Sequence, residues 1–236
     1  MKYPQGTHTA ETPQRVSIKV EGERVVSGLF QAAAGARACY VIAHGAGAGM
    51  THPFLAEVAN GLAHREISSL RYQFPYMEQG GKRPDTPKLA QATVRAAVSE
   101  AARLAPGLAI FAGGKSFGGR MTSQAQAVSP LSGVYGLIFL GFPLHPPGKP
   151  SLDRATHLFD VKIPMLFLQG TRDEFAQLEL LQPLTQQLGP NTTLELIQEG
   201  DHSFHVPARS GRKDADVRTE LLDAVASWSA TVMSGA

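Results

Sequence analysis

The sequence has few of the features that mark secreted, disulfide-stabilised or membrane proteins. It contains a single cysteine, Cys39, so no disulfide can form within the chain. No apolar run approaches the length needed to span a membrane, and residues 1–6 contain no apolar segment of the kind found in secretory leaders. We therefore expect a cytoplasmic protein without a membrane partner.

Charge of one sign is also scarce. The chain has 22 Lys and Arg against 20 Asp and Glu, which gives a formal net charge of +2, and it has no long basic tract. Composition therefore gives no reason to expect a nucleic-acid partner. The hydrophobic fraction of 43% and the length of 236 residues suit one α/β domain with a sizeable core.

Segments typical of buried strands alternate with segments typical of helices from residue 38 onward. The expected strands are 38–43, 68–74, 108–112, 133–141, 164–169 and 192–198. The expected helices are 52–64, 88–104, 117–128, 176–188 and 214–233. This alternation predicts an α/β fold in which a mostly parallel, twisted sheet has helices on both faces.

The N-terminal part differs from this pattern. Residues 16–20 and 24–32 flank a turn at 21–23 and predict an antiparallel hairpin at the edge of the sheet. Residues 1–14 are polar and rich in Pro and Thr, which predicts a loose tail. Residues 15–236 are expected to form a single domain.

A Gly-x-Ser-x-Gly pattern lies between an expected strand and an expected helix. It consists of Gly114, Ser116 and Gly118, and it follows the apolar run 108–112. A nucleophile elbow has this context, because its sharp, strained turn raises a serine hydroxyl above the sheet edge. The two glycines leave room for the turn. We therefore predict that Ser116 is a nucleophile.

The same residues also match the end of a phosphate-binding loop, G-x-x-x-x-G-K-[ST]. The first glycine of that pattern should stand at position 109, where this chain has Ala109. A phosphate-binding loop also needs open backbone whose N–H groups face the phosphates. The apolar run before Gly113 predicts a strand instead, so the elbow is the favoured interpretation.

Two further residues lie after expected strands. Asp173 follows 164–169 and His202 follows 192–198, and the carboxyl ends of parallel strands meet at one edge of a sheet. The chain order Ser, Asp, His is that of the α/β-hydrolase triad. In that chemistry His202 accepts the proton of Ser116 during attack on an ester-like carbonyl, and Asp173 holds the imidazole in the correct tautomer.

Other residues compete for these roles. The alternative acids are Asp160, Glu174 and Asp201, and the alternative base is His205. Asp173 is also placed to cap the following helix. His202, His205 and Asp201 are metal-ligand types, but no third cluster supports a metal site. We predict neither a metal nor another cofactor.

The negative oxygen formed during such an attack needs N–H donors. Phe117 directly follows the serine and offers one donor at a helix N-terminus. The glycine-rich stretch 44–49 offers the other through Ala46 or Gly47, and the sequence leaves this choice open. His44 is expected to order this stretch.

Four residues are predicted to contact the substrate: Arg71, Tyr76, Lys115 and Phe142. Further cations stand nearby in the sequence, namely Lys82, Arg83 and Arg120. Their number favours an anionic acid moiety, although solvation or pairing with neighbouring carboxylates explains them equally well. The stretch 142–164, where a lid would lie, is too short for a large cap over the site.

These motifs resemble those of the dienelactone-hydrolase-like α/β-hydrolases, and more closely those of the group that contains NSL-complex subunit 3 and testis-expressed hydrolase-like proteins. The resemblance rests on residues 44–48, 71–76, 114–121, 170–173 and 200–204. It implies an α/β-hydrolase fold and a triad of Ser116, Asp173 and His202. In one respect the chain departs from the pattern, because dienelactone hydrolases proper carry cysteine at the position of Ser116.

Together these observations predict a serine hydrolase for small ester or thioester substrates that works through an acyl-enzyme, as a monomer or homodimer. The alternative is a hydrolase-fold interaction protein with little or no turnover. The complete set of predicted site residues argues against that alternative, since a non-catalytic copy need not keep them.

Overall fold

Eight strands form one sheet in the computed structural model, which describes residues 11–235. Their order across the sheet is β1-β2-β4-β3-β5-β6-β7-β8. Their bounds are β1 Gln14–Lys19, β2 Val25–Gln31, β3 Ala38–Ala43, β4 Ile67–Tyr72, β5 Ala109–Lys115, β6 Val134–Leu140, β7 Met165–Gly170 and β8 Thr192–Ile197. β1 and β2 pair antiparallel, β2 runs antiparallel to β4, and all other pairings are parallel. The predicted edge hairpin and parallel sheet are confirmed.

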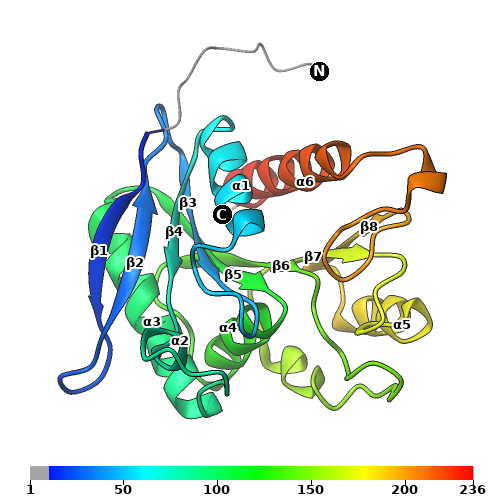
Figure 1. The fold of residues 1–236 in the computed structure, drawn as a ribbon, viewed down its shortest axis with the longest axis horizontal. Helices are drawn as coiled ribbons and strands as arrows, with labels where there is room; N and C mark the ends of the chain where they lie inside the picture. Colours follow the sequence, from blue (N-terminus) through cyan, green and yellow to red (C-terminus); the bar gives the residue numbers. More distant parts are fainter. Residues whose placement is uncertain (1–10, 236) are drawn as a thin grey trace.

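Helices cover both faces of this sheet (Figure 1). They are α1 Pro53–Ala63, α2 Pro75–Glu78, α3 Pro87–Leu104, α4 Phe117–Val128, α5 Leu178–Leu188 and α6 Asp214–Ser234, with the short 3₁₀ helices η1 Thr156–Asp160 and η2 Ala208–Ser210. α1 and α6 pack on one face, and α3, α4 and α5 pack on the other (Figure 1). The apolar core is accordingly split into two layers separated by the sheet.

Two of these helices begin with a side-chain cap followed by proline. The Nδ1 atom of His52 accepts the N–H of Phe54 at the start of α1, and the hydroxyl of Thr86 accepts the N–H of Leu89 at the start of α3. Proline at the first helical position loses nothing, because that N–H has no partner within the helix. These caps place both helix starts within one residue of the predicted positions.

The structure differs from the predictions in the short elements. No helix was expected in the stretch 75–87 or in the stretch 142–164, yet α2 begins at Pro75 and η1 forms at Thr156–Asp160. β1 begins at Gln14, one residue inside the predicted tail. Residues 1–10 of that tail lie outside the described residues. None of the helices within residues 11–235 is long and apolar enough to cross a membrane.

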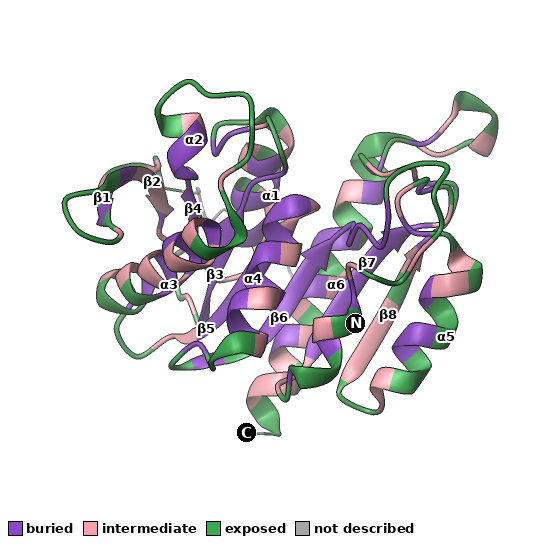
Figure 2. Cartoon of the chain, turned by 90° about the horizontal axis from the view of Figure 1, so that it is seen from below, coloured by how far each residue is buried: buried purple, intermediate pink, exposed green. Residues whose placement is uncertain are grey.

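The central strand β5 carries the motif-bearing segment. It pairs in parallel with β3 on one side and with β6 on the other, so its backbone N–H groups form the hydrogen bonds of the sheet. These groups cannot bind phosphates, so the alternative interpretation of residues 109–116 as a phosphate-binding loop is wrong. Figure 2 shows β3, β5, β6 and β7 in the buried class and the outer strand β8 as mostly intermediate. The carboxyl ends of β3, β5, β6, β7 and β8 meet at one edge, where ligands bind in open α/β sheets.

An aromatic cluster fills the core beneath this edge. Phe139 on β6 lies 4.7 Å from Phe167 on β7 and 5.1 Å from Phe142, measured between ring centroids. All three side chains have 0% exposure. The cluster therefore fixes the spacing between the ends of β6 and β7, next to the loop that bears Asp173.

We expect Phe139→Ala to lower the free energy of unfolding by about 3–5 kcal/mol, because it leaves a cavity inside the cluster. Phe159→Ala is the matched control, since Phe159 lies on η1 with 46% exposure. Its cost should stay below about 1 kcal/mol. Urea denaturation followed by circular dichroism measures both values, and equal costs would contradict this account of the core.

Candidate active site

Ser116 occupies the sharp turn between β5 and α4. Its backbone has φ 50° and ψ −115°, a conformation that a non-glycine residue rarely adopts. A Cβ atom at Gly114 would lie 2.2 Å from the carbonyl oxygen of Ala43, and one at Gly118 would lie 2.6 Å from the same atom. Only glycine allows β3 to approach the turn this closely. The Gly-x-Ser-x-Gly pattern thus follows from the packing of β5 and α4 against the end of β3.

The structure brings the three residues of the predicted triad together. The Oγ of Ser116 lies 2.8 Å from Nε2 of His202, and Nδ1 of His202 lies 2.7 Å from Oδ2 of Asp173. The acceptor-only carboxylate assigns the Nδ1 proton to the bond with Asp173, so Nε2 accepts the hydroxyl proton of Ser116. The Asp173 side chain is fully buried, while that of His202 is 20% exposed. The imidazole therefore has an opening toward a substrate.

Two residues that the sequence analysis did not single out hold this pair in place. Gln169, a buried polar residue at the end of β7, donates its side-chain N–H to Oδ2 of Asp173. The N–H of Phe175 donates to Oδ1 at 2.8 Å, and its ring stacks on the imidazole of His202 at 4.2 Å between centroids. A glutamine inside the otherwise apolar run of β7 was the available signal for the first of these roles.

The alternative acids and base make other contacts. Asp201 accepts two N–H groups of its own turn, at 2.8 and 2.9 Å. His205 pairs through Nδ1 with Asp214 at 2.8 Å. Glu174 and Asp160 are exposed. His202 and His205 thus have different carboxylate partners and do not share a ligand set.

The two candidates for the second oxyanion donor differ in the structure. The N–H of Gly47 donates to the hydroxyl of Tyr76 at 2.9 Å. Within residues 11–235, the N–H groups of Ala46 and Phe117 have no acceptor. Tyr76 is only 5% exposed, and its hydroxyl anchors the loop that bears Gly47 to the protein interior. Of the two candidates for the second donor, Ala46 is therefore the one whose N–H has no acceptor within residues 11–235.

His44 orders this loop, as expected. Its Nδ1 lies 2.7 Å from the carbonyl oxygen of Gly45, and its Nε2 accepts the N–H of Phe74 at 3.1 Å. Burial lowers the pKa of His44, although the bond to Gly45 opposes that shift. The neutral ring, with one proton on Nδ1, satisfies both contacts.

Two of the predicted substrate contacts are corrected by the structure. Arg71 is 3% exposed and donates from Nη1 to the carbonyl oxygen of Met50 at 3.3 Å, so it braces the chain ahead of α1. Phe142 has no exposed surface and belongs to the aromatic cluster. The sequence located both residues near strand ends, but it did not reveal that their side chains point into the protein.

Lys115, the last residue of β5, also serves the protein itself. Its ammonium donates to the backbone carbonyl of His202 and lies 5.5 Å from the ring centroid of Phe204. Burial lowers the pKa of Lys115 to about 8, and the negative charges of Asp173 and Asp201 oppose this shift. The contact ties the strand that precedes the serine to the loop that carries the histidine, and the contact of Lys115 with substrate stays a prediction.

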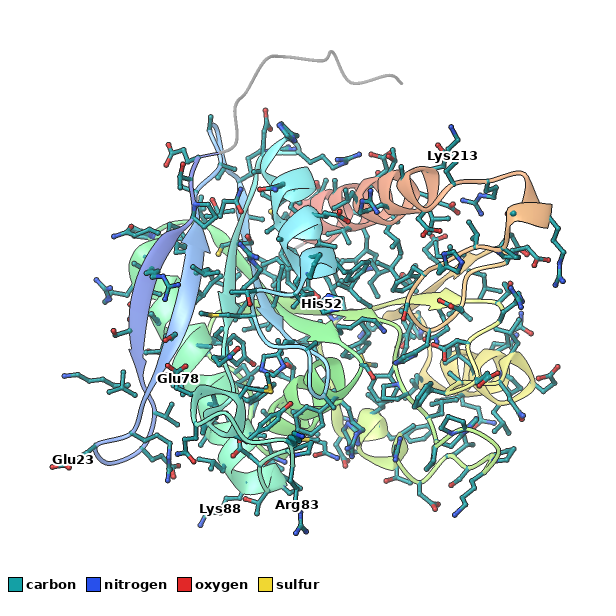
Figure 3. The ribbon with its side chains drawn as sticks, in the orientation of Figure 1. Glu23, His52, Glu78, Arg83, Lys88 and Lys213 are labelled. Atoms are coloured by element: carbon teal, nitrogen blue, oxygen red, sulfur yellow. The ribbon has the colours of Figure 1, made fainter. Side chains whose placement is uncertain are left out.

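The cations in the loop before α3 and in the first turn of α3 are exposed. Arg83 and Lys88 point outward from the body of the molecule (Figure 3) and are exposed, as is Lys82. The carboxylate of Glu78 accepts hydrogen bonds from Ser27. These charges therefore give no support to an anionic substrate.

Residues 36–230 match the family model described as an alpha/beta hydrolase domain. The chain belongs to the α/β-hydrolase family. Its fold is similar to that of a dienelactone hydrolase from Anabaena variabilis, with 22% identity, a TM-score of 0.75, and 94% of this chain and 97% of that chain covered. A lidless α/β serine hydrolase from Xanthomonas campestris has 20% identity and a TM-score of 0.72, with 92% and 95% covered. The esterase Pf2001 of Pyrococcus furiosus has 17% identity and a TM-score of 0.68, with 90% and 92% covered.

The burial of Lys115 predicts a specific dependence of stability on pH. Its pKa is near 8 in the folded chain and near 10.5 when unperturbed. Between these values the unfolded chain holds a proton that the folded chain has lost, so stability rises with pH. We expect the free energy of unfolding of the wild type to gain about 2–3 kcal/mol relative to Lys115→Met over this range.

Lys162→Met is the matched control, because Lys162 donates to the carbonyl of Phe159 from an exposed position. Urea denaturation at pH 7, 8, 9 and 10 gives the three stability curves. The wild-type and Lys162→Met curves should run parallel. Parallel curves for Lys115→Met would show that the ammonium is not desolvated.

Proposed function

We propose that the protein is a serine hydrolase that cleaves small esters or thioesters through an acyl-enzyme. The observation that carries this proposal is the continuous hydrogen-bonded chain from Ser116 through His202 to the buried carboxylate of Asp173. A serine hydroxyl becomes an effective nucleophile when a positioned base takes its proton, and that base needs a partner for the charge it gains.

The reaction follows from the contacts at this site. The Oγ of Ser116 attacks the carbonyl carbon while its proton passes to Nε2 of His202. The oxygen that becomes negative accepts hydrogen bonds from the N–H groups of Ala46 and Phe117. The imidazolium then protonates the leaving alcohol or thiol as its bond to the acyl carbon breaks. Water, deprotonated by the same histidine, attacks the acyl-enzyme and releases the acid.

Two features support small substrates. The segment between β6 and β7, residues 141–164, contains only the five-residue η1, so it supplies no helical cap over the serine. The similar fold from Xanthomonas campestris is described as a serine hydrolase without a lid. The motifs shared with the group that contains NSL-complex subunit 3 and testis-expressed hydrolase-like proteins lie at the same sheet edge, and we propose membership of that group.

The activated serine is tested by labelling with a fluorophosphonate probe. We expect the wild type to be labelled, and Ser116→Ala and His202→Ala to remain unlabelled. On p-nitrophenyl esters and thioesters, Ser116→Ala should lower kcat/KM by about 10⁴-fold or more. Asp173→Asn should lower it by about 10²–10⁴-fold, since the imidazole loses its orienting acceptor.

Ser203→Ala is the matched control, because Ser203 is an exposed serine next to His202. It should be labelled and turn over substrate like the wild type. If folded wild type neither reacts with the probe nor cleaves any ester, the hydrolase proposal fails, and the interaction-protein alternative gains support.

A further inference from the structure

Arg120 lies one helical turn beyond the nucleophile. It follows Ser116 by four residues on α4, a rise of about 6 Å along the helix axis. Helical side chains lean toward the N-terminus, so Arg120 leans back toward the serine. Its guanidinium carbon lies 5.9 Å from the ring centroid of Phe117, the residue whose N–H is a free donor. The cation therefore lies against the side chain of the residue that directly follows the nucleophile.

Arg120 has no acidic partner within residues 11–235. It is half-buried, and its Nε is a buried atom without an acceptor among the described residues. Ion pairs with Asp or Glu are instead formed by Arg37, Arg65, Arg103, Arg172, Arg212 and Arg218. A partly desolvated guanidinium without a counter-charge is costly, because no hydrogen bond replaces the lost water. Such a guanidinium next to a reactive site is a candidate for binding an anionic group of a ligand.

A second arginine lies close to the first. Arg154, in the segment ahead of η1, is half-buried and forms no ion pair or side-chain hydrogen bond within the described residues. Burial lowers the pKa of Arg120, and the like charge of Arg154 lowers it further. η1 packs on α4 through a 2.7 Å contact between Nε2 of His157 and the hydroxyl of Ser123. The segment that carries Arg154 is thus packed against the helix that carries Arg120, and neither arginine forms an ion pair with a carboxylate within the described residues.

His157 lies between η1 and α4, near the two arginines, and it carries no charge at neutral pH. Burial lowers its pKa to about 4, with a further contribution from Arg120 that Asp160 opposes. The hydroxyl of Ser123 donates to the carbonyl of Arg120 at 3.0 Å, so His157 donates its Nε2 proton to Ser123. At neutral pH the ring is uncharged, and the positive charge of the corner comes from the two arginines.

We infer that Arg120 and Arg154 form an anion-binding subsite that holds a carboxylate carried by the acyl part of the substrate. The inference rests on the proposed function, and it names the substrate class as half-esters or half-thioesters of short dicarboxylic acids. A guanidinium binds a carboxylate through paired, charge-assisted hydrogen bonds, and two guanidiniums that repel one another are stabilised by one shared anion. The rise of about 6 Å along the helix axis from Ser116 to Arg120 limits how far the substrate carboxylate can lie from the carbonyl that Ser116 attacks.

The test compares two esters with the same leaving group and similar acyl length, p-nitrophenyl butyrate and mono-p-nitrophenyl glutarate. We expect the wild type to favour the glutarate ester in kcat/KM by about 10-fold or more. Arg120→Gln and Arg154→Gln should each remove most of that preference, mainly by raising KM for the glutarate ester. Arg120→Lys keeps the charge and should retain part of the preference.

Arg103→Gln is the control, because Arg103 is an exposed arginine of α3 paired with Glu100. It should leave the ratio of the two kcat/KM values unchanged. The ratio is read within each variant, so a general loss of activity does not mimic the effect. If Arg120→Gln fails to fold, Arg154→Gln gives an independent answer. Equal turnover of the two esters by wild type, or an unchanged ratio in both glutamine variants, would overturn the inference.

Failure of the proposed function is recognised separately, as the absence of labelling and of turnover for both esters. In that case the subsite is tested by calorimetric titration of glutarate into the folded wild type, Arg120→Gln and Arg154→Gln. Binding that both substitutions weaken by about 10-fold or more supports the subsite without catalysis. Equal binding in all three, or none in the wild type, overturns it.

Discussion

A fully buried carboxylate constrains the whole candidate site. Asp173 accepts hydrogen bonds from the imidazole of His202, the side chain of Gln169 and the N–H of Phe175. An unpaired charge at this depth would cost several kcal/mol, so each donor has to be in place in the folded state. The donors come from β7, from the loop after it and from the loop after β8. One charge therefore fixes the end of β7 and the loop that follows it against the loop after β8, which is distant in the sequence.

The same constraint explains why a lysine can lie beside the triad. Lys115 is desolvated, but it stands among two carboxylates, Asp173 and Asp201, whose charges keep its pKa from falling further. With a neutral His202 this corner carries two negative charges against one positive charge. When the imidazole takes the proton of Ser116, the corner becomes neutral, while the new negative charge appears on the substrate oxygen near α4. The fixed charges thus favour the direction of proton transfer that the proposed reaction needs.

Sequence reasoning succeeded where a local pattern determines local structure. The helix predicted over 117–128 matches α4, because the elbow fixes its start and Pro130 prevents it from continuing. The order of Ser116, Asp173 and His202 along the chain was sufficient to predict that they meet, since parallel strands bring their carboxyl ends to one edge. The short elements α2 and η1 were missed, because segments of four or five residues are too short to show a helical periodicity. The role of Gln169 was missed because it depends on its hydrogen bond to Asp173. The two side chains meet only after the chain turns at the end of β7.

The two predicted substrate contacts that were wrong, Arg71 and Phe142, failed for a different reason. Arg71, Lys115 and Arg120 look alike in the sequence, as cations beside a motif. The structure separates them by the bonds they donate: Nη1 of Arg71 donates to the carbonyl of Met50, although its Nε has no acceptor, and Lys115 donates to the carbonyl of His202. The side chain of Arg120 donates no hydrogen bond within the described residues. Which carbonyl or carboxylate lies within reach depends on the loop that follows the neighbouring strand, and neither spacing nor composition encodes that. For a cation next to a nucleophile, the lack of an internal hydrogen bond or ion pair is the observation from which we infer a ligand.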